Sequence, residues 1–268
     1  MTTSRIATFN LENFDETAPD AHPSLDERIT LMRPQIERLR ADIVCFQEVN
    51  GQERDGQPRD LHALRRLLED TNLDAAETVS TRTATKEVFD ERNLVVASLY
   101  RQSTADPPDE TAEPVEIERP ILHVEISVDE KPLHVINVHL KSKLPSEVAG
   151  RKIDAFTWKT ADSWAEGAFI SSMKRMSQAV EVRRLVDRIL DDDADARIVV
   201  AGDFNATPEE VPVLAIRGAV EDTVPEPARY TLYHQGKGQL LHDESAAFAD
   251  DRKYPESDHA PVVAAFEF

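Results

Sequence analysis

Short apolar runs that end in polar residues recur along the chain, and each run predicts a β-strand. They cover residues 4–10, 42–49, 93–100, 120–128, 133–140 and 197–203. A further apolar run follows Ser257. Most of these runs are followed by Asn, Gln, Asp, Glu or His, so the strands are expected to deliver polar side chains at their ends.

Helical periodicity separates several of the predicted strands. Apolar residues recur at helical spacing from Leu25 to Arg40, with Asp26 and Glu27 in the first turn, where the helix dipole favours acidic groups. A shorter helix is predicted from Leu61 to Leu68. The pattern that begins at Met173 predicts a long helix ending near Leu190, with its Met residues filling the core.

Strands and helices intermix without a linker typical of a domain boundary. Residues 103–118 are rich in Pro and acidic residues and predict a surface loop. The chain of 268 residues has the length of one large domain or two small ones. We therefore expect a single mixed α/β domain over residues 1–268.

Composition adds expectations about location. The N-terminal residues lack a basic stretch followed by an apolar one, so no signal peptide is predicted. No apolar run approaches the roughly 20 residues that a membrane helix needs. Cys45 is the one cysteine, so no internal disulfide can form, and it is expected to be a buried packing thiol. Together these features predict a cytoplasmic protein with no membrane partner.

The net charge of −20 restricts the substrates that the chain can attract. An acidic surface repels nucleic acid at long range, because duplex binding depends on Lys and Arg that neutralise phosphates. A phosphate-handling protein of this charge needs divalent cations, a local basic patch or a small substrate. The simpler interpretation of the charge is adaptation to salt or solubility.

The polar residues at the strand ends are of the types that bind metals and phosphate. They are Asn10, Glu12, Gln47, Glu48, His139, Asp203, Asn205, Asp258 and His259. Each has an ordinary explanation by itself, because Asp and Asn favour turns and helix caps. Repetition at one end of several strands is different, because ligands of layered α/β proteins gather where strand ends converge.

These residue types suit metal-assisted phosphoryl chemistry. Mg²⁺ takes oxygen ligands from one or two carboxylates and keeps several waters. Phosphoryl transfer also needs a group that orients the attacking water and positive groups near the phosphoryl oxygens. The sequence has no HExxH, Walker, GxSxG or Cys/His zinc pattern, which argues against those chemistries.

Five strings stand in the order expected of the endonuclease/exonuclease/phosphatase superfamily, which includes deoxyribonuclease I and exonuclease III. They are FNLENF, FQEV, INVHLKSK, AGDFNATP and SDHAPV. The chain resembles this superfamily over nearly its whole length, although the strings do not identify the substrate. The resemblance implies an α/β (α+β) fold: a four-layer sandwich of two mixed β-sheets packed face to face, with helices on the outer faces.

The resemblance also implies roles for individual residues. Glu48, Asn10 and Asp258 correspond to the ligands of a divalent metal, Mg²⁺ or Mn²⁺. Asp203 corresponds to the group that orients or deprotonates the attacking water. The residues expected to contact the phosphate are Asn205 and His259.

Five further residues are implied by shorter matches. His139 resembles the acid-side histidine of the deoxyribonuclease I type, and Glu91 in DERNLVVASLY resembles the residue that supports it. Arg119 resembles a phosphate-contacting arginine, and Lys141 and Lys143 of the HLKSK string are expected to bind substrate. A surface salt bridge is the alternative role for Glu91 and for Arg119.

One string departs from the superfamily pattern. Where members commonly have a segment like LDHILVS, whose Asp supports the final histidine, this chain has GQLLHDESAAF. His242 stands in the place of that Asp, and Asp243 comes one residue later. A shift of one residue turns a strand side chain to the opposite face. Either a bulge returns Asp243 to His259, or the pair is altered.

The segment after His139 is locally basic and aromatic. Seven Lys and Arg face four Asp and Glu between Lys141 and Arg175, and the segment also holds Phe156, Trp158, Trp164 and Phe169. Such a mixture suits an anionic substrate that can stack, for example single-stranded nucleic acid. The alternative is a packed excursion whose aromatic residues belong to the core.

The sequence therefore leads to three functional hypotheses. The first is a divalent-metal-dependent phosphodiester hydrolase, a nuclease that cleaves DNA or RNA by in-line attack of an activated water. The second keeps the fold and metal but acts on a phosphomonoester or on a small-molecule or lipid phosphodiester. The third is a catalytically degenerate binding module. The expected partner is nucleic acid or another phosphoester substrate, with the protein a monomer.

Overall fold

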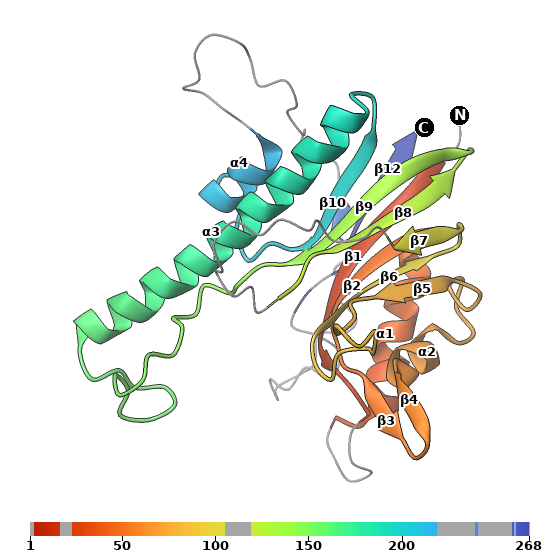
Figure 1. Cartoon of the computed structure of the whole chain (residues 1–268). Helices are drawn as coiled ribbons and strands as arrows, with labels where there is room; N and C mark the ends of the chain where they lie inside the picture. Colours follow the sequence, from red (N-terminus) through yellow and green to blue (C-terminus); the bar gives the residue numbers. More distant parts are fainter. Residues whose placement is uncertain are drawn as a thin grey trace.

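The computed structural model describes residues 3–16, 23–104, 119–218, 239–240, 259 and 261–267. Its secondary structure is arranged in four layers, with two β-sheets in the middle and helices outside them (Figure 1). The small hairpin of β3 (Gln52–Arg54) and β4 (Gln57–Asp60) lies beside the layers.

In the described part of the chain, the first sheet has six strands, and it combines segments from near both ends of the sequence. Its order is β11 (Gln239–Leu240), β12 (Val262–Glu267), β1 (Thr3–Phe14), β2 (Ile43–Val49), β6 (Asn93–Ser98) and β5 (Glu77–Ser80). β1 and β2 are parallel, whereas β12 and β6 run antiparallel to their neighbours. The sheet is therefore mixed, and β1 and β2 end at the same edge.

The second sheet has four strands, in the order β10 (Arg197–Asp203), β9 (Lys131–His139), β8 (Leu122–Val128) and β7 (Gln102–Thr104). β9 and β10 are parallel and in register, so that His139 and Asp203 are paired. β8 and β9 form an antiparallel hairpin through Asp129 and Glu130, both with positive φ.

Helices cover the two outer faces. They are α1 (Leu25–Leu39), α2 (His62–Leu68), α3 (Ala161–Asp192) and α4 (Val211–Arg217). α1 begins at a capping box of Ser24 and Glu27, a sequence signature that fixes its start. The N-terminal end of α3 projects beyond the sheets together with the loop before it (Figure 1).

Three apolar clusters hold these layers together. The first joins α1 and α2 to the six-stranded sheet, and includes Met32, Leu64 and Phe46. The second lies between the two sheets. The third joins the four-stranded sheet to α3 and α4. The predicted four-layer sandwich is confirmed.

Most predicted elements are present, with different bounds in some places. β1 continues past Asn10 to Phe14, and α3 begins at Ala161, well before Met173. The short elements β3, β4, β5, β7 and α4 were not predicted from the pattern. Most of the predicted loop over 103–118 lies outside the described residues, although Ser103 belongs to β7. Within the described ranges, no helix is long and apolar enough to cross a membrane.

A pair of buried amides connects the two sheets. The Gln47 side chain donates to the side-chain oxygen of Asn137 across the inter-sheet core, over 2.8 Å. Asn137 in turn donates to the backbone oxygens of Phe46 and Val95. These carbonyls lie where a bulge between Phe46 and Val49 interrupts the pairing of β2 with β6. Asn137 therefore satisfies backbone groups at the bulge and fixes one sheet against the other.

We predict that Gln47 and Asn137 are energetically coupled. Asn137→Leu is expected to lower the free energy of unfolding by about 3 kcal/mol, because it leaves buried groups without partners. A double-mutant cycle with Gln47→Leu should give a coupling energy of about 1–2 kcal/mol in urea unfolding. The same cycle between Asn137→Leu and Gln35→Leu, a buried amide in α1, should be additive. Additivity in both cycles would contradict a specific inter-sheet contact.

Candidate active site

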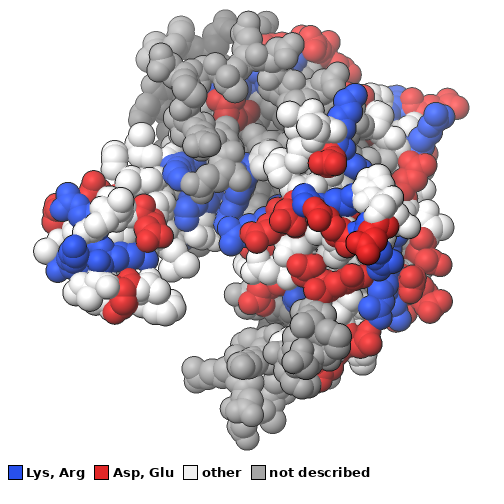
Figure 2. All heavy atoms as spheres, turned by 60° about the horizontal axis from the view of Figure 1, so that its bottom comes forward, with Lys and Arg blue, Asp and Glu red and all other residues white. Residues whose placement is uncertain are grey.

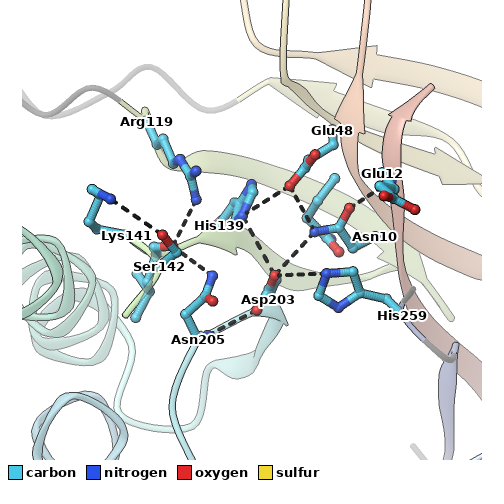
Figure 3. Close-up of polar contacts among 12 residues, drawn as sticks. Asn10, Glu12, Glu48, Arg119, His139, Lys141, Ser142, Asp203, Asn205 and His259 are labelled. Carbon is cyan, nitrogen blue, oxygen red and sulfur yellow. Dashed lines mark hydrogen bonds and ion pairs between the residues drawn. The ribbon is translucent and has the colours of Figure 1, made fainter. Parts of the chain in front are cut away.

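The sequence-predicted residues converge at one edge of the sandwich, where β1, β2, β9 and β10 end (Figure 3). Asn10 and Glu48 come from the first sheet, and His139 and Asp203 come from the second. His259 precedes β12 and points at Asp203 (Figure 3). Parallel pairing within each sheet places these strand ends together, as the sequence pattern indicated.

Glu48 is turned into the site by an irregular backbone. Its φ of 59° lies in the left-handed region, within the bulge that follows Phe46. The Glu48 carboxylate accepts from the side-chain nitrogen of Asn10 at 3.2 Å and from the backbone nitrogen of Asn13 at 3.1 Å. A non-Gly residue in this conformation is strained, and such strain gathers at functional sites.

The end of β1 has the same irregularity. Glu12 and Asn13 both have positive φ, and the register of β1 against β2 shifts between Asn10 and Phe14. Arg28 of α1 stabilises this turn by donating to the carbonyls of Leu11, Glu12 and Asn13. Burial lowers the pKa of the Arg28 guanidinium, although Glu12 opposes the shift. α1 thus holds the strand end that presents Asn10 and supports Glu48.

Asp203 lies at the centre of the cluster. Its Oδ2 atom accepts from Asn10 at 3.1 Å, and lies 3.5 Å from Nε2 of His139 and 3.8 Å from Nε2 of His259. The residue before it, Gly202, has a φ of 138°, and a Cβ there would lie 2.0 Å from the Val138 oxygen. Only glycine allows β10 to approach β9 this closely, which is what brings Asp203 beside His139.

Asn205 and Arg119 lie on the other side of Asp203 and share one acceptor. The side-chain nitrogen of Asn205 and Nη1 of Arg119 each donate to the Leu140 carbonyl at 3.0 Å (Figure 3). Asn205 also donates from its backbone to Asp203, with a φ of 47°. Gln178 of α3 holds the segments that carry Arg119 and Lys141, by donating to the Arg119 carbonyl and accepting from the Lys141 amide.

Several predicted residues do not join this cluster. Lys141 extends from the end of β9 toward Ser142, and Lys143 forms a 2.8 Å ion pair with Glu210.

The Glu91 side chain is exposed. Glu91 was expected to support His139, but among the described residues it does not contact that side chain. Nδ1 of His139 is instead buried, with no hydrogen-bond partner in the described part of the chain. Asp258, His242 and Asp243 lie outside the described residues.

His139 is neutral at pH 7. Burial lowers its pKa to about 4, and Arg119 adds to the shift, whereas Asp203 and Glu48 oppose it. Its Nε2 atom lies 3.5 Å from both carboxylates, so the tautomer with the hydrogen on Nε2 is favoured. The site therefore contains two carboxylates bridged by a neutral imidazole and an amide.

The donor set fits a hard divalent cation. The Glu48 and Asp203 carboxylates are mostly buried and share Asn10 and His139 as neighbours. Two such anions in a site of reduced dielectric need a compensating positive charge. The Asn10 amide oxygen accepts from the Glu12 backbone, so this amide has to turn over for its oxygen to face a cation. Carboxylate and amide oxygens are the ligands that Mg²⁺ and Mn²⁺ prefer.

A comparison with known protein families identifies the family to which this chain belongs. The sequence model of the endonuclease/exonuclease/phosphatase family matches residues 7–255. The chain belongs to this family. Its members are hydrolases that act on phosphoester bonds and generally depend on divalent metals, so this chain is a phosphoester hydrolase by family.

Solved structures of the same fold cover nearly the whole chain. An endonuclease/exonuclease/phosphatase family protein from Bacteroides thetaiotaomicron has 13% identity and a TM-score of 0.59, over 98% of this chain and 94% of that one. Sphingomyelinase C from Streptomyces griseocarneus has 14% identity and a TM-score of 0.57, over 100% of both chains. The catalytic domain of human nocturnin has 17% identity and a TM-score of 0.52, over 99% and 93%.

Identities this low show the fold and leave the substrate open. A comparison with curated protein sequences gives no significant match. Substrate and metal identity therefore have to be inferred from the residues of this chain.

Three residues that position this family site were not predicted from the sequence. Arg28 and Gln178 lie on helices, where a polar residue ordinarily indicates a solvent-facing position. Asn137 interrupts the apolar run of β9. Two features of the sequence could have identified these residues. One is an Asn inside a strand that is otherwise apolar, and the other is a polar residue at a helix position whose periodicity indicates the buried face.

We predict that metal-free protein loses stability as the pH falls from about 6.5 toward 4, partly through His139. Its folded pKa lies below the ordinary value of 6.5, so the unfolded chain binds more protons in this range. His139→Gln, which removes the titrating group, should lose less stability than wild type between pH 7 and pH 5 in urea unfolding. Equal losses in both proteins would contradict a buried neutral His139.

Proposed function

We propose that this chain is a divalent-metal-dependent phosphodiester hydrolase that cleaves DNA or RNA by in-line attack of an activated water. The observation that carries the proposal is the position of Asp203 between Asn10, His139 and His259, within a donor set that suits a hard cation. The family activity supports the reaction class, and this geometry supports the residue roles that we propose.

The proposed metal ligands are Glu48 and Asn10, and the sequence pattern adds Asp258, which lies outside the described residues. A bound Mg²⁺ or Mn²⁺ would neutralise charge on the phosphoryl oxygens. Asn13 and Asn10 hold the Glu48 carboxylate from two directions, which orients it before substrate arrives. Preorganised groups of this kind cost little reorganisation during the reaction.

Asp203 is the proposed acceptor of a proton from the attacking water. Its Oδ1 atom accepts from the backbone of Asn205, and its Oδ2 atom faces both imidazoles. His259 is partly exposed and can reach a phosphoryl oxygen, while the Nε2–H of His139 can donate to another. Because His139 is neutral in the free protein, its acid-side role requires that the bound phosphate raise its pKa.

Arg119 and Asn205 are the proposed phosphate-orienting pair. Both anchor to the Leu140 carbonyl, so their donor groups lie on the same side of Asp203 (Figure 3). A guanidinium, with five donors in a planar fork, suits recognition of a phosphate. Lys141 lies next to this pair, which supports a contribution to substrate binding.

The segment over residues 141–175, which we name the arm, supports nucleic acid as the substrate. Phe156 is 93% exposed, and Trp164 and Phe169 are also exposed, so their ring faces are free to stack on bases. The arm begins two residues after His139 and projects from the sheets (Figure 1). An exposed aromatic surface on the projecting arm can hold a strand whose phosphate enters the site.

The charges of the arm contribute less than their number indicates. Arg151 pairs with Glu166, Lys152 lies over the Trp158 ring, and Arg175 donates to the carbonyls of Lys141 and Ser142. Figure 2 shows Lys and Arg interspersed with Asp and Glu on the face that it displays. Binding by stacking is compatible with a net charge of −20, whereas binding by a large basic surface is not.

A lipid phosphodiester is the second candidate substrate, favoured by one observation. Leu144 and Ile153 are exposed near the beginning of the arm, in addition to Phe156. Aliphatic side chains do not stack on bases, and a set of exposed apolar residues also suits the surface of a lipid aggregate.

We predict that phosphodiester hydrolysis requires both a divalent metal and Asp203. EDTA should abolish hydrolysis of a generic phosphodiester, and Mg²⁺ or Mn²⁺ should restore it. Asp203→Ala should lower kcat by about 10²–10⁴-fold, the usual contribution of a positioned general base.

Asp195→Ala is the matched control for that experiment, because it removes an exposed carboxylate just before the opposite end of β10. It should retain wild-type rates. Metal-independent hydrolysis, or full activity of Asp203→Ala, would refute the proposal.

A second prediction separates the two substrates. Phe156→Ala should weaken binding of a single-stranded oligonucleotide by about tenfold, since stacking contributes roughly 1–3 kcal/mol per base. Because few arm charges are free, the affinity should depend only weakly on salt.

Leu144→Ala provides the matched control, because it removes an apolar side chain that cannot stack. Fluorescence anisotropy measures the oligonucleotide affinity, and flotation with neutral vesicles measures lipid binding. If nucleic acid is the substrate, only Phe156→Ala should lower the oligonucleotide affinity measured by anisotropy. Loss of vesicle binding in both variants, with no oligonucleotide binding by wild type, would favour the lipid substrate.

A further inference from the structure

A second cluster of metal-ligating side chains lies on the β8–β9 hairpin, away from the candidate active site. It consists of His123 and Glu125 of β8 and His134 of β9. The register pairs Glu125 with His134, and His123 lies two residues from Glu125 on the same strand. All three side chains therefore project from one face of the sheet.

That face is the outer one. Val124 and Ile126 of β8, and Val135 of β9, pack into the core between the sheets, so the residues that alternate with them point the other way. His139 follows His134 by five residues on a regular strand and lies on the opposite face, about 17 Å along β9 at the usual rise per residue. The cluster is thus separate from the active site.

The ligand atoms are already gathered. Nε2 of His123 lies 3.0 Å from Nδ1 of His134, and that Nδ1 atom lies 3.8 Å from a Glu125 carboxylate oxygen. One ligand atom from each of the three residues lies within 4.8 Å of the others. Tetrahedral Zn²⁺, with bonds of about 2.0–2.1 Å, needs ligand atoms about 3.3 Å apart. The separations in the cluster, from 3.0 Å to at most 4.8 Å, bracket that spacing.

The burial and the rigid framework of the cluster favour an ordered metal site. Both histidines are largely buried, whereas Glu125 is about half exposed and leaves a route from solvent. Two regular strands also hold the ligands rigidly, which lowers the entropy cost of assembling a site.

We propose that His123, His134 and Glu125 form a transition-metal site that takes Zn²⁺, with a water as the fourth ligand. Two imidazoles and one carboxylate are the donor set of known Zn²⁺ sites, and imidazole-rich sites select Zn²⁺, Ni²⁺ or Cu²⁺ over Mg²⁺. The bound ion links β8 to β9 and stabilises the four-stranded sheet. The competing interpretation is a hydrogen-bonded histidine pair that binds no metal.

Metal titration of the full chain, stripped with EDTA and then held in excess Mg²⁺, tests this site. Calorimetry should detect one Zn²⁺, Co²⁺ should give the visible absorption of a tetrahedral complex, and Zn²⁺ should raise the Tm. His134→Gln should weaken Zn²⁺ affinity by at least about tenfold, as the loss of even an outer-shell partner does. Glu125→Gln, at an exposed position, gives a second variant in case the histidine change prevents folding.

Glu130→Gln is the matched control, because it makes the same change in the exposed turn of the same hairpin. It should bind Zn²⁺ like wild type. The proposal is overturned if wild type binds no Zn²⁺. It is also overturned if Zn²⁺ binding and the Co²⁺ spectrum persist unchanged in His134→Gln and Glu125→Gln, which would place the ion elsewhere.

Discussion

The hydrogen bond between the buried amides of Gln47 and Asn137 is the contact on which the candidate active site depends. Gln47 directly precedes Glu48 in β2, and Asn137 lies two residues before His139 in β9. Apolar packing between two sheets is non-directional and fixes their relative position only loosely. A buried amide pair is directional, so the distance between the carboxylate on one sheet and the imidazole on the other is set beside the site itself.

The site also concentrates backbone strain. Glu12, Asn13, Glu48 and Asn205 all have left-handed φ values, at a cost of about 1–3 kcal/mol each. The surrounding contacts maintain them: Arg28 binds the carbonyls at the end of β1, and Asn137 binds those at the bulge. These turns aim a carboxylate and an amide at a common point, which regular strands would direct to opposite faces. Stability is thus exchanged for a preorganised set of oxygen donors.

The sequence predicts that the strand ends converge, but it does not predict the buried polar residues that hold those ends in position. Asn10, Glu48, His139 and Asp203 follow apolar runs, and parallel pairing brings such positions to one edge. Asn137 and Gln178 act through tertiary contacts between segments far apart in the chain, which periodicity does not encode. A short string match suggested that Glu91 supports His139, but the Glu91 side chain is exposed. Sequence similarity over a few residues does not determine the direction of a side chain. The short strands β3, β5 and β7 are set by pairing rather than by their own pattern.

In our proposal, the edge formed by β1, β2, β9 and β10 is a divalent-metal phosphoester centre. A crystal structure of the protein soaked in Mn²⁺, with anomalous scattering to locate the ion, is the direct test. We expect an anomalous peak within about 2.3 Å of a Glu48 carboxylate oxygen, next to Asp203, with the Asn10 amide turned so that its oxygen faces the ion. A fully soaked crystal with no peak at Glu48, or with Mn²⁺ bound only elsewhere on the chain, would contradict it.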